Sequence, residues 1–584
     1  MYYIQNPLSN RDAALDEITR RYGYEYQRRK YVETYPYINS VYGSNDIRIR
    51  ELVERYGVNG TPYIPNPKTI SIGNITSNGI ILPQDLNSGI ARLSAVRGKS
   101  LVWNQLVKDY SQSGNLKATG SSTIRYEDGK IKISITEAGS NNAVGIATGQ
   151  FIAGHKVACL VEYAGTMPSI AKFGSWVSVG ASGSTSSSLR KSIRSLLTTS
   201  YDNGCLWLWG ESTDFEISTL NIIDLTLMFG EGHEPATVEE FEAMYPLPYY
   251  DYNTGTIINN SASGIKTVGF NQFDKGEVKE GYSLYDESGL EARAPSSWCS
   301  GWIPVLPNVV YYVSHVIAKI YGYAVHFYDK EKNHLYGIGI SGSTYDESGT
   351  VTTPANAAFA RLRSTLQVGY QEVSFNFSNF ALNGTYKPYK KDTLTLNLST
   401  IKGKLNGDGE SVTIFPDGMR SAGTAYDYLI VDADGYARKA VKVIGSVDMG
   451  TLNYTKAAVS SSYPYGYFSA LVAGRSSSNR NILSAKYPTV PAWNVDKVVR
   501  GTSSNATIYV IDSAYAESDA ATFKSAMSGV ELIYELATPQ EYVLDEPIYT
   551  FFEVEKGGML RAEYNDSEQV HAPLDVDLIY SEAK

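Results

Sequence analysis

The stretch LTLMFGEGHEPATVEEFEAMYP, residues 225–246, gathers side chains that bind metals or transfer protons, namely His233, Glu234, Glu239, Glu240 and Glu242. A zinc helix of the HExxH type needs two histidines one helical turn apart, but this stretch holds one, and Pro235 interrupts it. Thr237 and Glu240 instead have the spacing of a capping box, followed by the apolar residues Phe241 and Met244. The sequence therefore predicts a capped helical turn and no metal site.

A second stretch, VIDSAYAESDAATFKSAM, repeats the apolar frame of the first without its polar cluster. The paired residues are Asp224 with Asp512, Thr237 with Thr522, Phe241 with Phe523, and Met244 with Met527. His233 has no counterpart in the second copy. What recurs is a strand that ends in Ile-Asp, a loop and a short helix, which indicates a structural unit.

Other catalytic signatures are absent from the sequence. No G-x-S-x-G nucleophile motif, P-loop or dinucleotide fingerprint occurs, and no pair of carboxylates is singled out for glycoside hydrolysis. DKEKNH from Asp329 departs from a calcium loop at Glu331 and His334 and predicts a turn. Cys159, Cys205 and Cys299 are widely spaced, which predicts neither a disulfide framework nor a CxxC metal site. No cofactor or metal is expected.

Exposed aromatic residues remain as a possible binding signal. Candidates for stacking on sugar rings are Trp298, Trp302, Tyr463, Tyr465 and Tyr467, with Asp286 and Asp346 from the repeated pentapeptide YDESG as hydrogen-bonding neighbours. Aromatic side chains also fill the cores of β-sandwiches, and Asp, Ser and Gly are ordinary turn residues. Both interpretations stay open at this point.

Composition favours an all-β fold. The 584 residues include 46 Tyr and 51 Gly, with Ser, Thr and Asn plentiful, which suits strands and turns. A net charge of −10 argues against a general binder of nucleic acid or anionic membranes. No apolar run is long enough to cross a membrane, and the start does not resemble a signal peptide.

The pattern of turns and alternating strands predicts a mainly β chain of jelly-roll-like sandwiches in series after a short helical segment. The expected divisions are a helical docking segment at 1–57, a Pro/Gly/Asn-rich linker at 58–98, β-sandwiches at 99–257 and 258–392, a β-rich connector at 393–444 and a C-terminal β-sandwich at 445–584.

The segment 1–57 interleaves nine basic residues, eight of them Arg, with eight acidic residues and many tyrosines. Candidate attachment residues are Arg20, Arg21, Tyr24, Arg28 and Arg29. Arg and Tyr are frequent anchors of protein interfaces, so we expect a docking segment; an RNA-binding arm is the alternative.

Three stretches resemble tail-fibre and other appendage proteins of tailed phages and prophages of gut bacteria, and the composition resembles that of proteins from crAss-like gut phages. NIIDLTLMFGEGHEPATVEEFEAMYPLPYYDYNTG resembles a recurrent segment of that group, and SGVELIYELATPQEYVLDEP resembles its C-terminal module. GWIPVLPNVVYYVS, with TTPANAAFARLR and YKPY downstream, resembles its carbohydrate-binding-like sandwich. The resemblance brings no catalytic residues with it.

The resemblance implies a virion structural protein, a tail- or head-fibre subunit that binds host surface polysaccharide. It implies a homo-oligomer, most often a trimer, attached to other virion proteins through its N-terminal segment. Two alternatives remain open, a polysaccharide depolymerase and a purely architectural collar or capsid-associated protein without a ligand.

Overall fold

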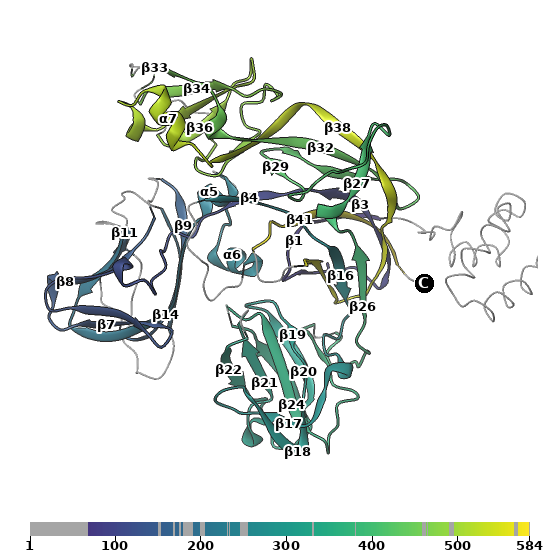
Figure 1. Cartoon of the computed structure of the whole chain (residues 1–584). Helices are drawn as coiled ribbons and strands as arrows, with labels where there is room; N and C mark the ends of the chain where they lie inside the picture. The colour runs from purple at the N-terminus through teal and green to yellow at the C-terminus, as the bar shows by residue number, and fades with distance from the viewer. Residues whose placement is uncertain are drawn as a thin grey trace, which may run out of the picture.

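The computed structural model confirms the prediction of a mainly β chain (Figure 1). It describes residues 68–83, 85–149, 154–166, 170–173, 177–178, 191–198, 205–230, 232, 234–245, 255–329, 332–354, 356–379, 381–457, 459, 463, 465–489, 496–565 and 570–582. The predicted docking segment 1–57, with Arg20, Arg21, Tyr24, Arg28 and Arg29, lies outside these residues, as does His233.

Two sheets around one core form the centre of the protein, here called the framework. The larger sheet orders its strands as β1 (Lys68–Ile75), β41 (Leu574–Glu582), β3 (Gly89–Arg97), β31 (Tyr428–Val431), β32 (Tyr436–Asp448), β38 (Glu531–Tyr549), β27 (Lys402–Leu405) and β28 (Val412–Thr413). The smaller sheet orders them as β2 (Ile80–Ile81), β40 (Met559–Glu563), β16 (Gly264–Val268) and β26 (Lys391–Thr395). Leu93 and Leu578 of the first sheet and Ile265 and Leu560 of the second share the same core.

The linker predicted at 58–98 is wrong for the part that the structure describes. β1 and β3 pair with β41, and Ile75, Leu93 and Val96 are fully buried in the framework core. Residues 393–444 and 531–582 belong to the same framework and not to a connector and a separate final domain. The local sequence shows the turns of these segments but not the strands, some hundreds of residues away, that they pair with.

Three modules interrupt the chain that forms the framework, each between two paired antiparallel strands. Module A, residues 104–255, lies between β4 (Ser100–Trp103) and β15 (Thr256–Asn259), which form a separate two-stranded sheet with Trp103 opposite Thr256. Module B, residues 270–389, lies between β16 and β26, and module C, residues 449–530, lies between β32 and β38. Each module therefore replaces the turn of a β-hairpin and is held at both of its ends.

Module A consists of two five-stranded sheets that share one core. One sheet contains β11 (Val177–Ser178), β10 (Ile170–Phe173), β13 (Cys205–Gly210), β8 (Gly139–Ala147) and β5 (Leu116–Ala118). The other contains β12 (Lys191–Thr198), β9 (Lys156–Gly165), β14 (Thr213–Asp224), β7 (Lys130–Ile135) and β6 (Thr123–Glu127). Ile146 and Leu208 from the first sheet pack with Ile133 and Val161 from the second.

The capped helical turn predicted at 237–244 is confirmed. α6 (Val238–Met244) begins at Thr237, whose side chain accepts a hydrogen bond from the backbone N–H of Glu240 at 3.2 Å. The Glu240 carboxylate reaches back to the backbone N–H of Ala236. α6 and α5 (Leu225–Phe229) fill the space between module A and the framework, where Phe241 is fully buried (Figure 1).

The predicted correspondence with the second frame holds for the aspartate and the phenylalanine. Asp224 caps α5 and Asp512 caps the 3-10 turn Ser513–Tyr515, while Phe523, like Phe241, is fully buried. The correspondence fails at the threonine. Thr237 is the N-cap of α6, whereas Thr522 lies inside α7 (Ala520–Ala526), whose N-cap is Asp519. α7 covers the module C sheet of β33 (Tyr454–Ala457), β34 (Tyr467–Leu471), β37 (Thr507–Ile511) and β36 (Val498–Gly501).

Module B, at the bottom of Figure 1, has a larger sheet and a smaller one around a common core. The larger contains β17 (Lys279–Leu284), β18 (Glu291–Cys299), β24 (Phe359–Thr365), β21 (Val325–Tyr328) and β22 (His334–Ile338), with β19 (Ile303–Pro304) beside β24. The smaller contains β23 (Glu347–Thr352), β20 (Val310–Val316) and β25 (Phe375–Phe377). The jelly-roll-like connection predicted for the modules stays a prediction.

A buried carboxylate holds the irregular part of the framework together. Asp427 is 1% exposed and accepts hydrogen bonds from the backbone N–H groups of Val443 at 2.8 Å, Ile444 at 3.0 Å and Arg420 at 2.9 Å. The first two donors lie at the register shift where β32 bulges against β38. Asp427 thus satisfies backbone groups that the bulge removes from the ladder.

Substitution of Asp427 by alanine should lower the free energy of unfolding by about 2–4 kcal/mol, because three buried N–H groups lose their acceptor. Urea denaturation of the full chain measures this loss. Asp417→Ala is the matched control, since the Asp417 side chain is 69% exposed and pairs with Arg420 at the surface; its effect should stay below about 1 kcal/mol. Equal losses in the two variants would contradict the role of Asp427.

Module B should be removable without unfolding the framework. The backbone N–H of Gly269 donates to Lys390 O at 2.9 Å, so these residues already form the closing pair of a hairpin. Replacing residues 270–389 by Asn-Gly, which favours the type I′ turn, should leave a cooperative thermal transition that circular dichroism detects. A deletion of equal length at 280–399 removes β26 and should abolish that transition. Loss of the transition in both variants would show that the framework depends on module B.

Candidate functional site

Trp302 of module B is a partly exposed indole held by its neighbours. It lies in the short loop between β18 and β19 and is 38% exposed. The rings of Tyr328 and Phe359 meet it edge to face, with ring centres 4.8 and 6.0 Å away. The guanidinium carbon of Arg361 lies 4.9 Å from the centre of the indole ring, and Lys332 Nζ lies 5.2 Å from it. Aromatic and cationic contacts therefore fix the orientation of this ring.

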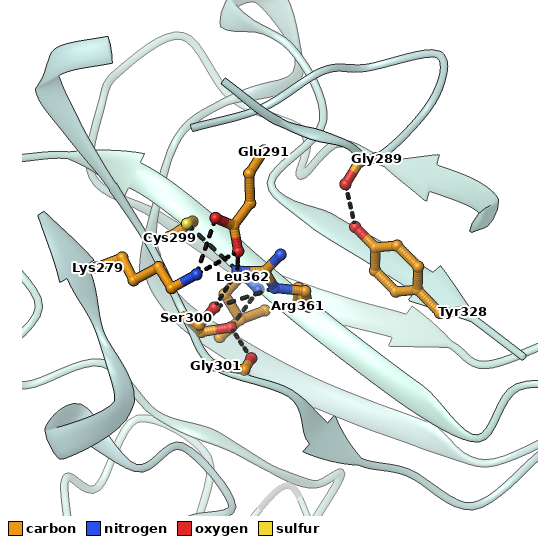
Figure 2. A network of polar contacts seen from close by, with 9 residues as sticks. All are labelled: Lys279, Gly289, Glu291, Cys299, Ser300, Gly301, Tyr328, Arg361 and Leu362. Carbon is orange, nitrogen blue, oxygen red and sulfur yellow. Dashed lines mark hydrogen bonds and ion pairs between the residues drawn. The ribbon is translucent and has the colours of Figure 1, made fainter. Parts of the chain in front are cut away.

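Arg361 is itself fixed by a polar network beneath the surface (Figure 2). Its side chain is 3% exposed, and its guanidinium donates to Ser300 O at 2.7 Å and to a Glu291 carboxylate oxygen at 2.8 Å. Lys279 donates to the same carboxylate at 2.8 Å. A buried cation needs such a partner, because its desolvation is otherwise uncompensated.

The surroundings of Glu291 and Cys299 determine their protonation states. Burial alone would raise the pKa of Glu291, but the hydrogen bond from Lys279 and the charge of Arg361 outweigh it and hold the pKa below its usual value. Burial raises the pKa of the Cys299 thiol, to which Arg361 also donates at 3.4 Å. Glu291 therefore stays ionised and Cys299 stays protonated, so the network supports Trp302 and offers no nucleophile.

The alternating pattern of β24 places Arg361 there. Ala360 and Leu362 face the core of module B, so Phe359, Arg361 and Arg363 face the opposite side of the sheet. Small or apolar residues thus alternate with larger outward-facing residues along FARLR, as expected for a strand with one face in the core. The sequence did not single out Arg361 as a functional residue, since its partner Glu291 and its aromatic neighbour Trp302 come from distant segments.

A cavity of about 270 Å³ lies beside Trp302, between module B and the framework. Its lining residues are Lys266, Val268, Gln272, Asp274, Glu277, Gly301, Trp302, Ile303, Pro304, Tyr389, Lys391, Met559 and Arg561. The three cations come from the framework strands β16, β26 and β40, and the two carboxylates come from module B. We call this the Trp302 cavity.

The prediction that Trp298 forms an exposed platform is wrong. Trp298 is fully buried in the core of module B, where its ring packs beside Phe273 with ring centres 5.7 Å apart. Its indole N–H donates to Gly369 O at 3.0 Å. Trp298 lies in β18 with its side chain in the module B core, whereas Trp302 lies in the loop that follows this strand.

Asp286, a candidate from the first YDESG pentapeptide, has a structural partner. Its carboxylate accepts a hydrogen bond from the backbone N–H of Tyr323 at 2.8 Å and forms an ion pair with Arg363. Arg363 also donates to Tyr323 O at 2.6 Å and to Leu284 O at 2.8 Å. Asp286 therefore holds the loop of the first pentapeptide over the outer face of the sheet and lies apart from the lining of the Trp302 cavity.

Asp346, from the second YDESG pentapeptide, lies at the surface. Its carboxylate is 2.9 Å from Nδ1 of His315, a residue with φ of 59° at the register shift of β20. The neighbouring Tyr345 stacks on Tyr321 with ring centres 4.1 Å apart, and both rings are partly exposed. The two pentapeptides thus flank the segment around Tyr321 and Tyr323 but make different contacts with it.

Tyr463, Tyr465 and Tyr467 of module C are half-buried. The rings of Tyr463 and Tyr467 meet nearly at right angles with centres 5.2 Å apart, and Tyr509 packs against Tyr467 in the same way at 5.1 Å. Tyr465 and Tyr467 also cover the buried Val498 and Ile511. The structure brings the predicted tyrosines together and adds Tyr509, but as an edge-to-face cluster and not as a flat platform.

Within the described part of the chain, no group of three or more His, Cys, Asp or Glu side chains is placed to hold a metal ion. None of the helices in this part is long and apolar enough to cross a membrane. No family model matches the chain, and no curated protein is found to be similar to it.

Two histidines lie under the loop of the first pentapeptide. His326 of β21 is fully buried, and its Nδ1 lies 3.1 Å from Nε2 of His334 on β22. Burial lowers the pKa of His326 to about 3, and the charges of Arg363 and His334 act in the same direction. Burial also lowers the pKa of His334. Both rings are therefore neutral in the folded chain near pH 7.

These histidines should make module B sensitive to mild acid. The unfolded chain takes up a proton on each histidine near pH 6.5, whereas folded His326 stays neutral down to about pH 3. The stability that His326 contributes is thus complete above about pH 6.5 and falls as the pH drops towards 3, by up to about 1.4 kcal/mol per pH unit. The lowered pKa of His334 acts in the same direction. Urea denaturation of the full chain at pH 7 and pH 5 should show a smaller difference for His326→Phe than for the unmodified chain.

His315→Gln is the control for this prediction, because His315 belongs to the same module but is exposed and lies beside Asp346. This variant should keep the full difference between pH 7 and pH 5. An unchanged difference in His326→Phe would show that other groups cause the acid sensitivity.

Proposed function

We propose that this protein is a structural protein of a tailed-phage virion, a subunit of a tail or head fibre that presents β modules to glycans on the host surface. The subunit assembles with copies of itself, as a trimer, and attaches to other virion proteins through residues 1–57. Parallel copies suit this role, because several weak sites on one particle bind far more tightly than one site.

The glycan-binding proposal rests on one observation. The indole of Trp302 is held in a fixed orientation beside a cavity. An indole held by Tyr328, Phe359 and Arg361 loses little freedom when a sugar ring stacks on it, so little ordering opposes binding. The cavity supplies charged groups that hydrogen-bond to hydroxyls. Most of the exposed large apolar side chains in the described part of the chain also lie in module B.

Glycan binding by the full chain tests the proposal. On an array of host surface polysaccharides, the full chain should bind a subset, and Trp302→Ala should weaken that binding at least about tenfold, equivalent to about 1.4 kcal/mol. Tyr126→Ala is the matched control, because Tyr126 of module A is 39% exposed, close to the 38% of Trp302; it should bind like the unmodified chain.

The absence of binding to any host polysaccharide would contradict glycan recognition and favour an architectural protein of the collar or capsid. Imaging of the particle then decides the location, since the proposal expects the chain in a fibre. Binding that is equal in Trp302→Ala and the unmodified chain would move the recognition site away from Trp302.

A depolymerase is the second candidate, because the carboxylates Asp274 and Glu277 line the same cavity. Glycosidases act through two carboxyl groups that flank the scissile bond. Incubation with host polysaccharide distinguishes the two functions. New reducing ends that disappear in Asp274→Asn or Glu277→Gln would make module B a hydrolase, whereas binding without cleavage supports the proposed function.

A further inference from the structure

The Trp302 cavity has two walls of opposite charge, and none of the ion pairs found among the described residues joins one wall to the other. Lys266, Lys391 and Arg561 form the framework wall, and Asp274 and Glu277 form the module B wall. Arg561 pairs instead with Glu563 of its own strand at 3.0 Å. The cavity between the walls therefore separates charges that attract each other.

The arrangement of the framework wall is unfavourable on its own. Lys266 of β16 lies directly opposite Arg561 of β40, and like charges at such positions repel each other. Lys391 lies diagonally across from Lys266 on β26. Burial lowers the pKa of Lys266, and the charges of Arg561 and Lys391 lower it further, which outweighs the opposite effect of Glu563 and Asp274. A group that accepts hydrogen bonds from this wall would relieve the repulsion.

The module B wall needs the opposite kind of group. Asp274 accepts a hydrogen bond from the backbone N–H of Gly276, which fixes the turn Lys275–Glu277, and it faces the cavity beside Glu277. These carboxylates accept hydrogen bonds and repel anions. An anionic ligand would therefore satisfy the framework wall at the expense of Asp274 and Glu277, and a cationic ligand would do the reverse.

We infer that the Trp302 cavity binds one uncharged sugar ring, whose hydroxyl groups accept hydrogen bonds from Lys266, Lys391 and Arg561 and donate them to Asp274 and Glu277. A hydroxyl is both donor and acceptor, so one uncharged ligand serves both walls. Trp302 supplies the apolar wall on which the ring stacks. The volume of about 270 Å³ lies just below the 300–1,000 Å³ of pockets for drug-sized ligands, which suits a single ring.

This inference rests on the proposed glycan recognition and gives it a ligand class and a place. The site is complete only where module B meets the framework, since neither contributes both walls. A bound ring therefore bridges the two units, and binding should raise the melting temperature of the full chain.

Matched oligosaccharides test the ligand class. Isothermal titration of the full chain should give at least tenfold tighter binding for a neutral hexose oligosaccharide than for the same chain length made of uronic acids or of amino sugars. Lys266→Met and Asp274→Asn should each weaken neutral binding at least fivefold. Lys132→Met and Asp128→Asn, which remove an exposed ion pair of module A, are the matched controls and should bind normally.

A variant that gains affinity shows that weaker binding in the other variants comes from the site and not from a general loss of folding. The double variant Asp274→Asn with Glu277→Gln removes the anionic wall and leaves three cations, so it should bind the uronic-acid oligosaccharide at least fivefold more tightly than the unmodified chain. A destabilised protein would not gain affinity for one ligand in this way.

The outcomes also separate the inference from the proposed function. Preference of the unmodified chain for acidic sugars, or neutral binding that survives in Lys266→Met and Asp274→Asn, overturns the inference and leaves glycan recognition standing at another surface. Failure of the unmodified chain to bind any oligosaccharide overturns both.

Discussion

The antiparallel ladder between β3 and β41 is the interaction on which the rest of the structure depends. It joins residues 89–97 to residues 574–582, and Arg97 reinforces it with ion pairs to Asp577 at 2.5 Å and Asp575 at 3.4 Å. Because this ladder joins an early strand to the last strand of the described chain, the chain between them must leave and re-enter the framework. Such long-range pairing forms slowly, so the modules, whose contacts are more local, should fold before the framework closes around them.

The Trp302 cavity follows from the same constraint. Its cations lie on three framework strands, and its carboxylates and indole lie on an inserted module. Arg361 shows what holds the site in place: a buried ion pair contributes little net stability, since desolvation offsets much of its attraction, but it fixes geometry when every partner is present. The polar network behind Trp302 is better understood as a device for orientation than as a source of stability.

The sequence predicted those features that depend on neighbours in the chain. The capping box at Thr237 is confirmed, because it is decided within a few residues. Trp298 and Trp302 are only four positions apart, yet one is buried and the other exposed. Ser300-Gly301 marks the end of β18, but it does not show which face of the strand the core covers. Composition also made residues 68–97 resemble a linker, although their core positions are filled by Ile75, Leu93 and Val96. The pairing of Lys266 with Arg561 was beyond prediction, since it joins segments about three hundred residues apart.

The insertion of module B between paired strands has a mechanical consequence. Tension applied to the module reaches β16 and β26 together and draws both strands in the same direction, so it does not peel one from the other. The load instead runs along the ladder between β16 and β40, where the hydrogen bonds lie across the line of force and share it. A module anchored in this way resists extraction, because pulling on it loads the ladder in shear and many hydrogen bonds must break together.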